Sequence, residues 1–279
     1  MGLGNRIGRL VTILLALLTA GSSAWGNTTT DPAPNIVIFF TDDMGYADTG
    51  SYGNPYIRTP NLDRLAAQGQ RWTDFYVAAP VCSPSRGALL TGQYPVRSGL
   101  YGREVAVMFP GDPNGIPAEL LTLPEGLKSA GYTTGMFGKW HLGDAPDAYP
   151  TRHGFDYWYG TPFSNDMNAK GRLPVEEVYQ LRLAGEGERV MNNIRGVFLP
   201  QLLNPVNDNF DIYSVRSVAV EGGYEDEVLE RPIQQPTFTR KVTEETVAFI
   251  EANSDRPLFA YVPYSMPHLP LFASDEFSG

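Results

Sequence analysis

The stretch Asn-Ile-Val-Ile-Phe-Phe-Thr at residues 35–41 runs directly into Asp42 and Asp43. A short apolar run of β-branched and aromatic residues is typical of a strand that is buried on both faces of a sheet. In open parallel sheets, functional groups collect on the loops that follow the carboxyl ends of the strands. This stretch therefore predicts an α/β sheet and places the two carboxylates at its functional edge.

The downstream sequence alternates between helical and strand patterns, which favours a mainly parallel sheet with helices on its faces. Helices are indicated by N-terminal caps, by proline in the first turn and by a closing glycine. The predicted order is a helix from Thr59 to Gly69, a strand over 71–77, a helix capped by Ser83 and closed by Gly92, a helix opened by a capping box of Thr122 and Glu125, a strand over 132–137, a helix around 238–250 and a strand over 258–262.

Two regions depart from this pattern. Residues 1–26 contain basic Arg6 and Arg9, then an apolar run over 10–20, then small residues, which is the pattern of a secretory signal peptide. We therefore expect export to a periplasm, the medium or a lysosome-like compartment, with no membrane anchor after cleavage. Within 27–279, residues 168–235 are polar and weakly patterned. They are interpreted as either an insertion near the site or a poorly ordered loop.

The part of the chain beyond residue 26 is acidic. The sequence has 21 basic residues, and because Arg6 and Arg9 belong to the signal, 19 remain against 31 acidic residues. Nucleic-acid binding requires a basic surface, so this balance argues against a nucleic-acid partner. An anionic substrate would have to be held by a few local cations. The oligomeric state is left open.

Cys82 is the only cysteine of the sequence and begins the segment Cys-Ser-Pro-Ser-Arg, which ends at Arg86. It has no partner for an internal disulfide in an oxidising compartment. It also lies at a predicted helix amino terminus, where free N–H groups favour an anion. Three interpretations stay open: a small buried apolar residue, a thiolate nucleophile of lowered pKa, and a side chain that is converted after translation.

Other polar groups follow predicted strands. Asp42 and Asp43 are hard oxygen ligands that suit Ca²⁺ or Mg²⁺, although for an isolated Asp pair an exposed turn is the favoured interpretation. Lys139 and His141 are two residues apart and point the same way in extended backbone, which suits an anionic group undergoing transfer. An exposed lysine and a packed histidine are the alternative. His268 lies in a proline-rich loop, which fits a positioned acid and a structural loop equally well.

Taken in order along the chain, these segments resemble the sulfatase family. The similarity runs from about Pro34 to the last residue and is weakest across 168–235. The pattern C-x-P-x-R followed by G-K-W-H-L-G is highly specific, and the motifs are most like those of the branch that contains arylsulfatase A and N-acetylgalactosamine-6-sulfatase. The matching segments are Pro34-Asn35-Ile36, Asp42-Asp43-Met44-Gly45, Thr59-Pro60-Asn61-Leu62-Asp63, Cys82-Ser83-Pro84-Ser85-Arg86, Leu90-Thr91-Gly92, Gly138-Lys139-Trp140-His141-Leu142-Gly143, Gly160-Thr161-Pro162-Phe163-Ser164 and Pro267-His268.

The resemblance implies an alkaline-phosphatase-like α/β fold and the hydrolysis of a sulfate monoester, either an aryl or a carbohydrate sulfate. It implies that Cys82 is oxidised to Cα-formylglycine by a separate formylglycine-generating enzyme. One oxygen of the hydrated aldehyde would attack sulfur, and the other would later eliminate sulfate. Ca²⁺, or Mg²⁺ in its place, would be bound by Asp42, Asp43 and the converted residue 82.

The resemblance also implies roles for the remaining site residues. Arg86 would hold the geminal diol, and Lys139 would bind sulfate and a diol oxygen. His141 would act on the second hydroxyl, while His268 would meet the leaving oxygen. Ser164 would line the substrate site.

One departure from the family pattern concerns the metal site. The family completes it with an Asp-Asn pair, followed by a lysine, downstream of the position of His268, whereas this sequence ends at Gly279. The pair Asp208-Asn209 precedes His268 and is rejected as a substitute. We therefore expect an amino-terminal portion of the fold, truncated at the carboxyl end, that binds Ca²⁺ poorly and is inactive as this polypeptide. A phosphoric or phosphonic ester hydrolase on the same scaffold and a noncatalytic truncated binding protein stay open as alternatives.

Overall fold

A computed structural model describes residues 33–101, 107–113 and 115–278 of the chain. The chain divides into two units, Met1–Pro34 and Asn35–Gly279, and the second holds every described helix and strand. The predicted signal peptide, residues 1–26, lies outside the described residues. Among the described helices, none is long and apolar enough to cross a membrane.

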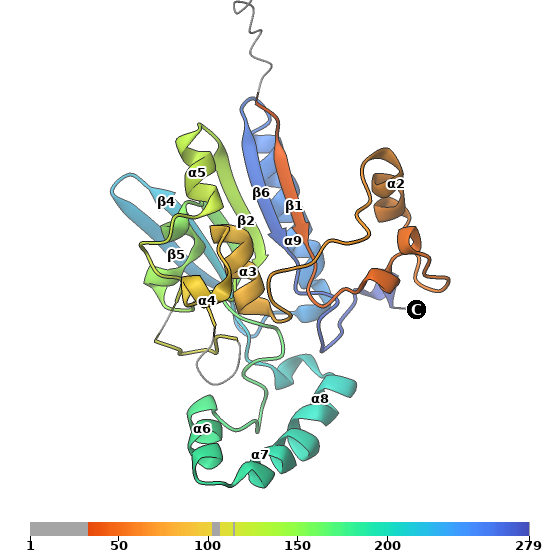
Figure 1. Ribbon diagram of the computed structural model, residues 1–279, viewed down its shortest axis with the longest axis vertical. Helices are drawn as coiled ribbons and strands as arrows, with labels where there is room; N and C mark the ends of the chain where they lie inside the picture. The colour runs from red at the N-terminus through yellow and green to blue at the C-terminus, as the bar shows by residue number, and fades with distance from the viewer. Residues whose placement is uncertain (1–32, 102–106, 114, 279) are drawn as a thin grey trace, which may run out of the picture. The chain divides into compact units, whose positions relative to one another are not determined.

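The centre of the second unit is a six-stranded sheet with the strand order β1-β6-β2-β3-β4-β5 (Figure 1). The first four strands in this order are parallel, and β4 and β5 form an antiparallel hairpin at the far edge. The strands are β1 Ile36–Phe40, β6 Leu258–Pro263, β2 Thr133–Lys139, β3 Tyr157–Thr161, β4 Ser214–Val220 and β5 Gly223–Glu230. The expected α/β fold with a mainly parallel sheet is confirmed.

Helices cover both faces of this sheet (Figure 1). Side chains alternate between faces along each strand, so β2 sends Met136 into one apolar core and Phe137 into the other. The first core contains Leu90 of α3, and the second contains Phe238 and Val242 of α9. The helices are α2 Pro60–Gln68, α3 Cys82–Thr91, α4 Pro95–Ser98, α5 Leu123–Ser129, α6 Val175–Leu183, α7 Gly187–Asn193, α8 Leu199–Leu203 and α9 Gln235–Ala252.

Several local predictions are confirmed. The capping box that opens α5 is present: the Thr122 hydroxyl accepts from the Glu125 amide, and the Glu125 carboxylate accepts from the Thr122 amide. The predicted strands over 132–137 and 258–262 are β2 and β6. Gly92 closes α3 in the left-handed conformation that favours glycine, with φ at 65°.

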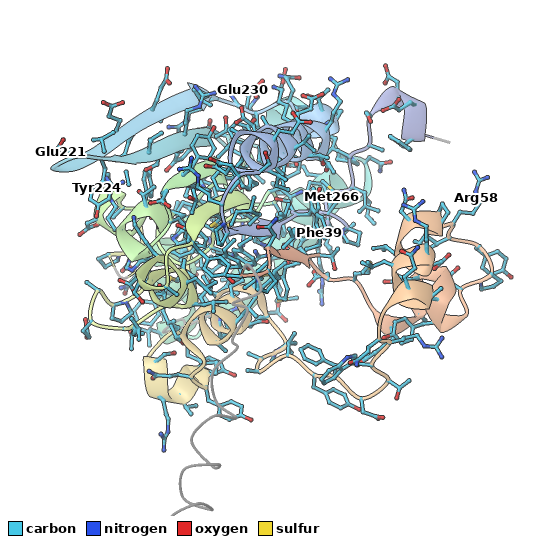
Figure 2. The ribbon with its side chains drawn as sticks, turned by 90° about the horizontal axis from the view of Figure 1, so that it is seen from above. Phe39, Arg58, Glu221, Tyr224, Glu230 and Met266 are labelled. Carbon is cyan, nitrogen blue, oxygen red and sulfur yellow. The ribbon has the colours of Figure 1, made fainter. Side chains whose placement is uncertain are left out.

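The prediction that residues 35–41 are buried on both faces is wrong. This strand, β1, is the edge strand of the sheet, and Val37 and Phe39 on one of its faces are 38% and 57% exposed. Figure 2 labels Phe39 on this strand. Its other face packs against the first core through Ile36, Ile38 and Phe40. The sequence pattern does not distinguish these two situations because a half-covered edge strand can be as apolar as a central one.

The predicted strand over 71–77 is also wrong, because the segment has no regular structure. Among the described residues, it is held by side chains instead of by a neighbouring strand. The Phe75 amide donates to the Tyr46 hydroxyl at 2.8 Å, and the Tyr52 hydroxyl donates to the Trp72 carbonyl at 2.6 Å. A segment rich in strand-forming residues therefore remains irregular when no neighbouring strand pairs with it.

The predicted cap at Ser83 is displaced by two residues. Helix α3 begins at Cys82, and Val81 occupies the N-cap position without a side-chain cap. The Ser83 hydroxyl instead accepts a hydrogen bond from the Met108 amide at 3.0 Å. This places Cys82 in the first turn of the helix.

Residues 168–235 are largely ordered into regular elements, contrary to the weak signals of their sequence. They contain α6, α7, α8 and the β4–β5 hairpin, whose residues Glu221, Tyr224 and Glu230 are marked in Figure 2. The hairpin extends the sheet through antiparallel pairing of β4 with β3. The region is therefore partly integrated into the central sheet and is not a loose loop.

Candidate active site

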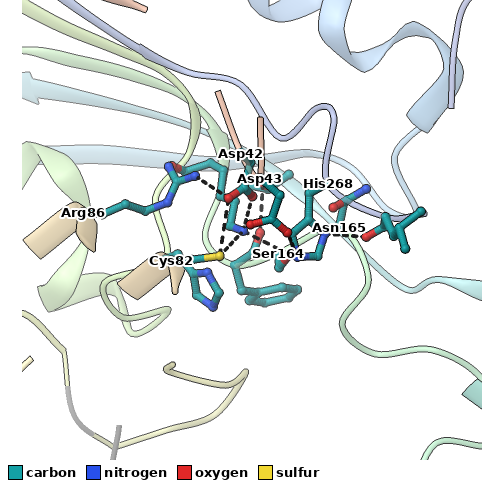
Figure 3. A network of polar contacts seen from close by, with 12 residues as sticks. Asp42, Asp43, Cys82, Arg86, Ser164, Asn165 and His268 are labelled. Atoms are coloured by element: carbon teal, nitrogen blue, oxygen red, sulfur yellow. Dashed lines mark hydrogen bonds and ion pairs between the residues drawn. The ribbon is translucent and has the colours of Figure 1, made fainter. Parts of the chain in front are cut away.

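The predicted site residues meet at the carboxyl edge of the parallel strands (Figure 3). Asp42 follows β1, Lys139 ends β2, Ser164 follows β3, and His268 lies in the loop after β6. Parallel strands end at the same edge of a sheet, so four segments that are distant in sequence supply side chains to one place. Helix α3 brings Cys82 and Arg86 to the same place from the face of the sheet.

Cys82 lies between a carboxylate and an ammonium group. Its Sγ is 3.4 Å from Asp42 Oδ1 and 3.2 Å from Lys139 Nζ. Burial raises the pKa of the Cys82 thiol, and the attraction of Lys139 does not overcome this effect. The surroundings of Cys82 therefore do not lower the pKa of its thiol, as the thiolate interpretation requires.

Asp42 is the anionic centre of the site. Its side chain is 5% exposed; Oδ1 lies 3.3 Å from Arg86 Nη2, and Oδ2 forms an ion pair with Lys139 Nζ. Burial by itself would raise the pKa of Asp42, but Lys139 and Arg86 outweigh it and hold the pKa well below its usual range. Asp42 is consequently ionised at neutral pH.

Arg86 is buried and is fixed by three contacts. Nη1 donates to the Lys139 carbonyl at 2.8 Å, Nη2 faces Asp42, and the guanidinium lies 5.5 Å from the centre of the Phe40 ring. Nε has no hydrogen-bond partner among the described residues. The result is a rigid cation beside Cys82 that retains unused donor capacity.

His141 differs from its predicted placement. Its φ of 64° is left-handed, so the backbone between Lys139 and His141 is not extended and the argument that both point the same way fails. Its Nε2 lies 2.9 Å from the Met108 carbonyl, which can only accept, so this nitrogen carries the proton. In the neutral ring Nδ1 then carries a lone pair, and this atom is buried without a hydrogen-bond partner in the described part of the chain.

The electrostatic surroundings keep His141 neutral. Burial lowers the pKa of its imidazole well below the usual value, and the positive charges of Lys139 and Arg86 act in the same direction. A neutral ring with an unpaired Nδ1 can accept a proton but does not hold one in the resting site. This is the protonation state that a general base requires.

Ser164 and His268 complete the site on two sides. The Ser164 hydroxyl accepts from Lys139 Nζ at 3.1 Å and is buried. His268 Nε2 lies 3.6 Å from Asp43 Oδ2, and the side chain of Asp43 is 60% exposed. Asp43 thus faces the open side of the site, whereas Asp42 faces its interior.

Three side chains with metal-ligating atoms lie at the same place. One atom each from Asp42, Cys82 and His268 lie within 4.8 Å of one another. For Ca²⁺ the fitting donors are the hard carboxylate oxygens of Asp42 and Asp43, whereas thiol and imidazole do not suit it. Asp42 fits such a site, whereas Asp43 follows it in sequence but does not belong to this group of three. An oxygen in place of the Cys82 sulfur would fit better than the thiol.

Sequence reasoning missed two residues that contact the site. Met108 binds Ser83 through its amide and His141 through its carbonyl, and nothing in its apolar side chain indicates this role. Asn165 directly follows Ser164 and is buried. Its position beside a predicted site residue was the only available signal.

Comparisons with known proteins identify a family whose motifs match the residues of this site. A sequence model of the sulfatase family matches residues 34–279. N-acetylgalactosamine-6-sulfatase of Mus musculus is 35% identical over 280 residues, which cover 97% of this chain and 45% of the relative. Arylsulfatase A of Bos taurus is 52% identical over 136 residues, which cover 48% of this chain and 26% of the relative.

A solved structure shares the fold. The crystal structure of PsFucS1 sulfatase from Pseudoalteromonas sp. aligns with a TM-score of 0.66 and 27% identity, covering 88% of this chain and 46% of that one. The chain thus spans about half or less of the length of the proteins it matches. Together with the matched family model, which covers nearly all of residues 33–279, these similarities confirm the resemblance found in the motifs. The chain belongs to the sulfatase family.

Proposed function

We propose that this chain carries the nucleophile side of a sulfuric ester hydrolase that cleaves a sulfate monoester, either an aryl or a carbohydrate sulfate. The observation that carries the proposal is the position of Cys82, with Asp42 and Lys139 within 3.4 Å of its sulfur and buried Arg86 beside it. Two buried cations around one small side chain suit the binding of an anionic group. Sulfate monoesters carry such a group at the bond that breaks.

In this proposal residue 82 acts after conversion to Cα-formylglycine, whose hydrate supplies an oxygen nucleophile. A separate formylglycine-generating enzyme performs the conversion with an external oxidant. The raised pKa of the unconverted thiol supports this assignment, because a protonated thiol is a weak nucleophile. The amino terminus of α3 adds free N–H groups that favour negative charge at this position.

The cations of the site orient the substrate. Lys139 Nζ already binds Asp42, Cys82 and Ser164, so it is held where it can bind a sulfate oxygen. Arg86 holds the oxygens of residue 82 through donors that the protein leaves unused. Because both cations are buried, their interaction with charge that develops on the substrate is little screened by water.

The two histidines serve opposite proton transfers. His141, neutral and with an unpaired Nδ1, accepts a proton at residue 82. His268 is 18% exposed, lies at the open side of the site and donates to the leaving oxygen. Ser164 lines the substrate site between Lys139 and the loop that carries His268. Water replaces the alcohol over the whole cycle, so the products are the alcohol and sulfate.

A bound Ca²⁺ would be held by Asp42 and Asp43 with residue 82, and Mg²⁺ is the alternative ion. Such an ion supplies a Lewis acid that lowers the pKa of a bound oxygen and offsets negative charge on sulfate. Other oxygen ligands complete its shell. The chain's own residues do the remaining work of binding, orientation and proton transfer.

The proposal includes the setting of the protein. Residues 1–26 act as a signal peptide, and the mature protein works in a periplasm, outside the cell or in a lysosome-like compartment. Its partners are the sulfate ester and the formylglycine-generating enzyme. Nucleic acid is not a partner, because the chain is acidic.

The test begins with the side chain of residue 82. The peptide that contains it is analysed by mass spectrometry after production in a host that converts such motifs, with Cys82→Ala as the control. The aldehyde mass is expected, and an unmodified cysteine in the native host contradicts the proposal.

The converted protein is then assayed in Ca²⁺ with the sulfate and phosphate esters of one aryl alcohol. Faster sulfate cleavage is expected. Faster phosphate cleavage favours a phosphoric ester hydrolase. No turnover of either ester agrees with the expectation that this polypeptide is inactive, and an unconverted Cys82 in the native host then favours a noncatalytic binding protein.

A further inference from the structure

Asn165 and Gln235 form a buried pair of amides beside the site, here called the amide clamp. Asn165 is 2% exposed and lies after β3, while Gln235 is 2% exposed and begins α9. Asn165 Nδ2 donates to Gln235 Oε1 at 3.1 Å, and Gln235 Nε2 donates back to the backbone carbonyl of Asn165 at 3.2 Å. The two hydrogen bonds fix each amide relative to the other.

The amide clamp also holds the loop that carries His268. Asn165 Nδ2 uses its second hydrogen to donate to the Pro270 carbonyl at 3.2 Å. Because that carbonyl can only accept, it also determines which end of the Asn165 amide carries the nitrogen. The loop is bound at its other end by the Asp42 amide, which donates to the Met266 carbonyl at 3.3 Å. His268 lies between these two attachment points, as Figure 3 shows beside Asn165.

Asn165 is also tied to the opposite side of the site. It directly follows Ser164, whose hydroxyl accepts from Lys139 Nζ. One short segment therefore contacts the sulfate-binding cation through Ser164 and the His268 loop through Asn165. Residues 164 and 165 therefore link Lys139 to the His268 loop through two hydrogen bonds.

We infer that Asn165, supported by Gln235, is a positioning residue that sets the place of His268 relative to Lys139. The catalytic effect of this positioning rests on the proposed function. The placement of His268 by Asn165 does not depend on that function and can be tested without a reaction. Loss of the clamp removes the side-chain hydrogen bond at the Pro270 end of the loop and leaves the backbone bond at the Met266 end in place. His268 then samples positions in which proton donation to a leaving oxygen fails.

The first experiment observes His268 without any reaction. The chain has three histidines, His141, His153 and His268, so the ring signals of a protein labelled in histidine are few enough to assign. Asn165→Ala is expected to shift and broaden the ring signals of His268 and to leave those of His153 unchanged. Unchanged His268 signals in folded Asn165→Ala protein overturn the inference.

Two further variants keep this experiment decisive. Gln235→Met preserves side-chain volume, removes both amide contacts and spares the bond from Asn165 to Pro270, so a smaller shift in the same direction is expected. It also replaces Asn165→Ala if that variant does not fold. The matched control is Asn253→Ala at the other end of α9, which loses a bond of 2.8 Å from its amide to the Phe249 carbonyl. It is expected to leave all three histidines unchanged.

The second experiment measures turnover of an aryl sulfate by the converted protein. Asn165→Ala is expected to lower kcat by about 10- to 100-fold, the usual effect of a catalytic group misplaced by about 1 Å, with a smaller change in KM. In a His268→Ala background, Asn165→Ala should cause no further loss, because it acts through His268. Losses that multiply in the double variant overturn the inference. If the unsubstituted chain turns over no sulfate ester, as is expected of this polypeptide, the histidine signals alone decide the role of the clamp, and the chemical state of residue 82 decides the proposed function.

Discussion

The edge of the sheet that carries the site and the segment from Tyr46 to Val77 differ in which kinds of side chain they bury. At the site, charged Arg86 and Lys139 are buried and are held by ion pairs and hydrogen bonds. In the other segment, apolar side chains are open to solvent: Trp72 is 60% exposed and Tyr76 is 77% exposed. Helix α2, within this segment, has no buried residue.

The difference shows where the free energy of folding is concentrated. Burying a charge is costly unless it is paired, so the site depends on every member of its polar network. The segment over 46–77 contributes little apolar burial and is held by side-chain hydrogen bonds, among them one donated by the Tyr52 hydroxyl and one accepted by the Tyr46 hydroxyl. Equal substitutions in the two regions should therefore have unequal effects.

The largest difference is expected between two phenylalanines. Phe259 of β6 is fully buried and stacks on Phe155 at 6.0 Å, whereas Phe75 is 59% exposed. Phe259→Ala should lower the free energy of unfolding by about 3–5 kcal/mol, through lost burial and a residual cavity. Phe75→Ala should cost less than about 1 kcal/mol. Urea denaturation followed by circular dichroism measures both, and similar losses would contradict the comparison.

Asp42 tests the polar network of the site. Asp42→Asn removes the anion that faces Arg86 and Lys139 and leaves two buried cations without it, which should destabilise the fold by about 3–5 kcal/mol. Asp255→Asn is the matched control, since Asp255 pairs with Arg256 on the surface. The control should unfold at the same urea concentration as the original protein. A small change in the free energy of unfolding of Asp42→Asn would show that the two buried cations do not depend on this carboxylate for their stability.

The pH dependence of stability should report the same carboxylate. The pKa of Asp42 is lowered in the folded protein, so the unfolded chain binds its proton more readily. Its contribution to stability is complete above the unfolded pKa of about 4 and declines as the pH falls toward the folded value. The stability gap between the original protein and Asp42→Asn should therefore narrow below about pH 4. A gap that stays constant down to acid unfolding would contradict this assignment.

The comparison also explains which features could be predicted from the sequence. Strand β2, strand β6 and the capping box of α5 combine strong local patterns with burial, so their sequences are distinctive. Strand β5 was missed because it is largely exposed. Its consecutive acidic residues Glu225, Asp226 and Glu227 interrupt the alternation of polar and apolar residues that is typical of a strand. The exposure of β1 was missed because it depends on what lies beside the strand.

The site was predictable to the extent that strand ends define it. Asp42, Lys139 and His268 could be placed at one edge because the strands before them are parallel. The left-handed backbone at His141 could not be predicted, since glycine and not histidine usually signals it. The contact between Asn165 and Gln235 joins residues that are 70 positions apart and follows no periodic pattern.

The smallest expected effect concerns the edge strand. Phe39 on β1 is 57% exposed and stacks on Tyr264 at 6.4 Å, so Phe39→Lys should cost about 1 kcal/mol or less of stability. Unpaired edge strands with apolar faces favour pairing between molecules, and a lysine on such an edge opposes it. Sedimentation velocity across a range of concentrations should therefore show less self-association for Phe39→Lys than for the original protein. Leu183→Lys, at an exposed position of α6, is the control and should not reduce self-association. If both substitutions reduced self-association equally, the cause would be the added positive charge, which is the same in both variants. Pairing through strand β1 would then not be the cause.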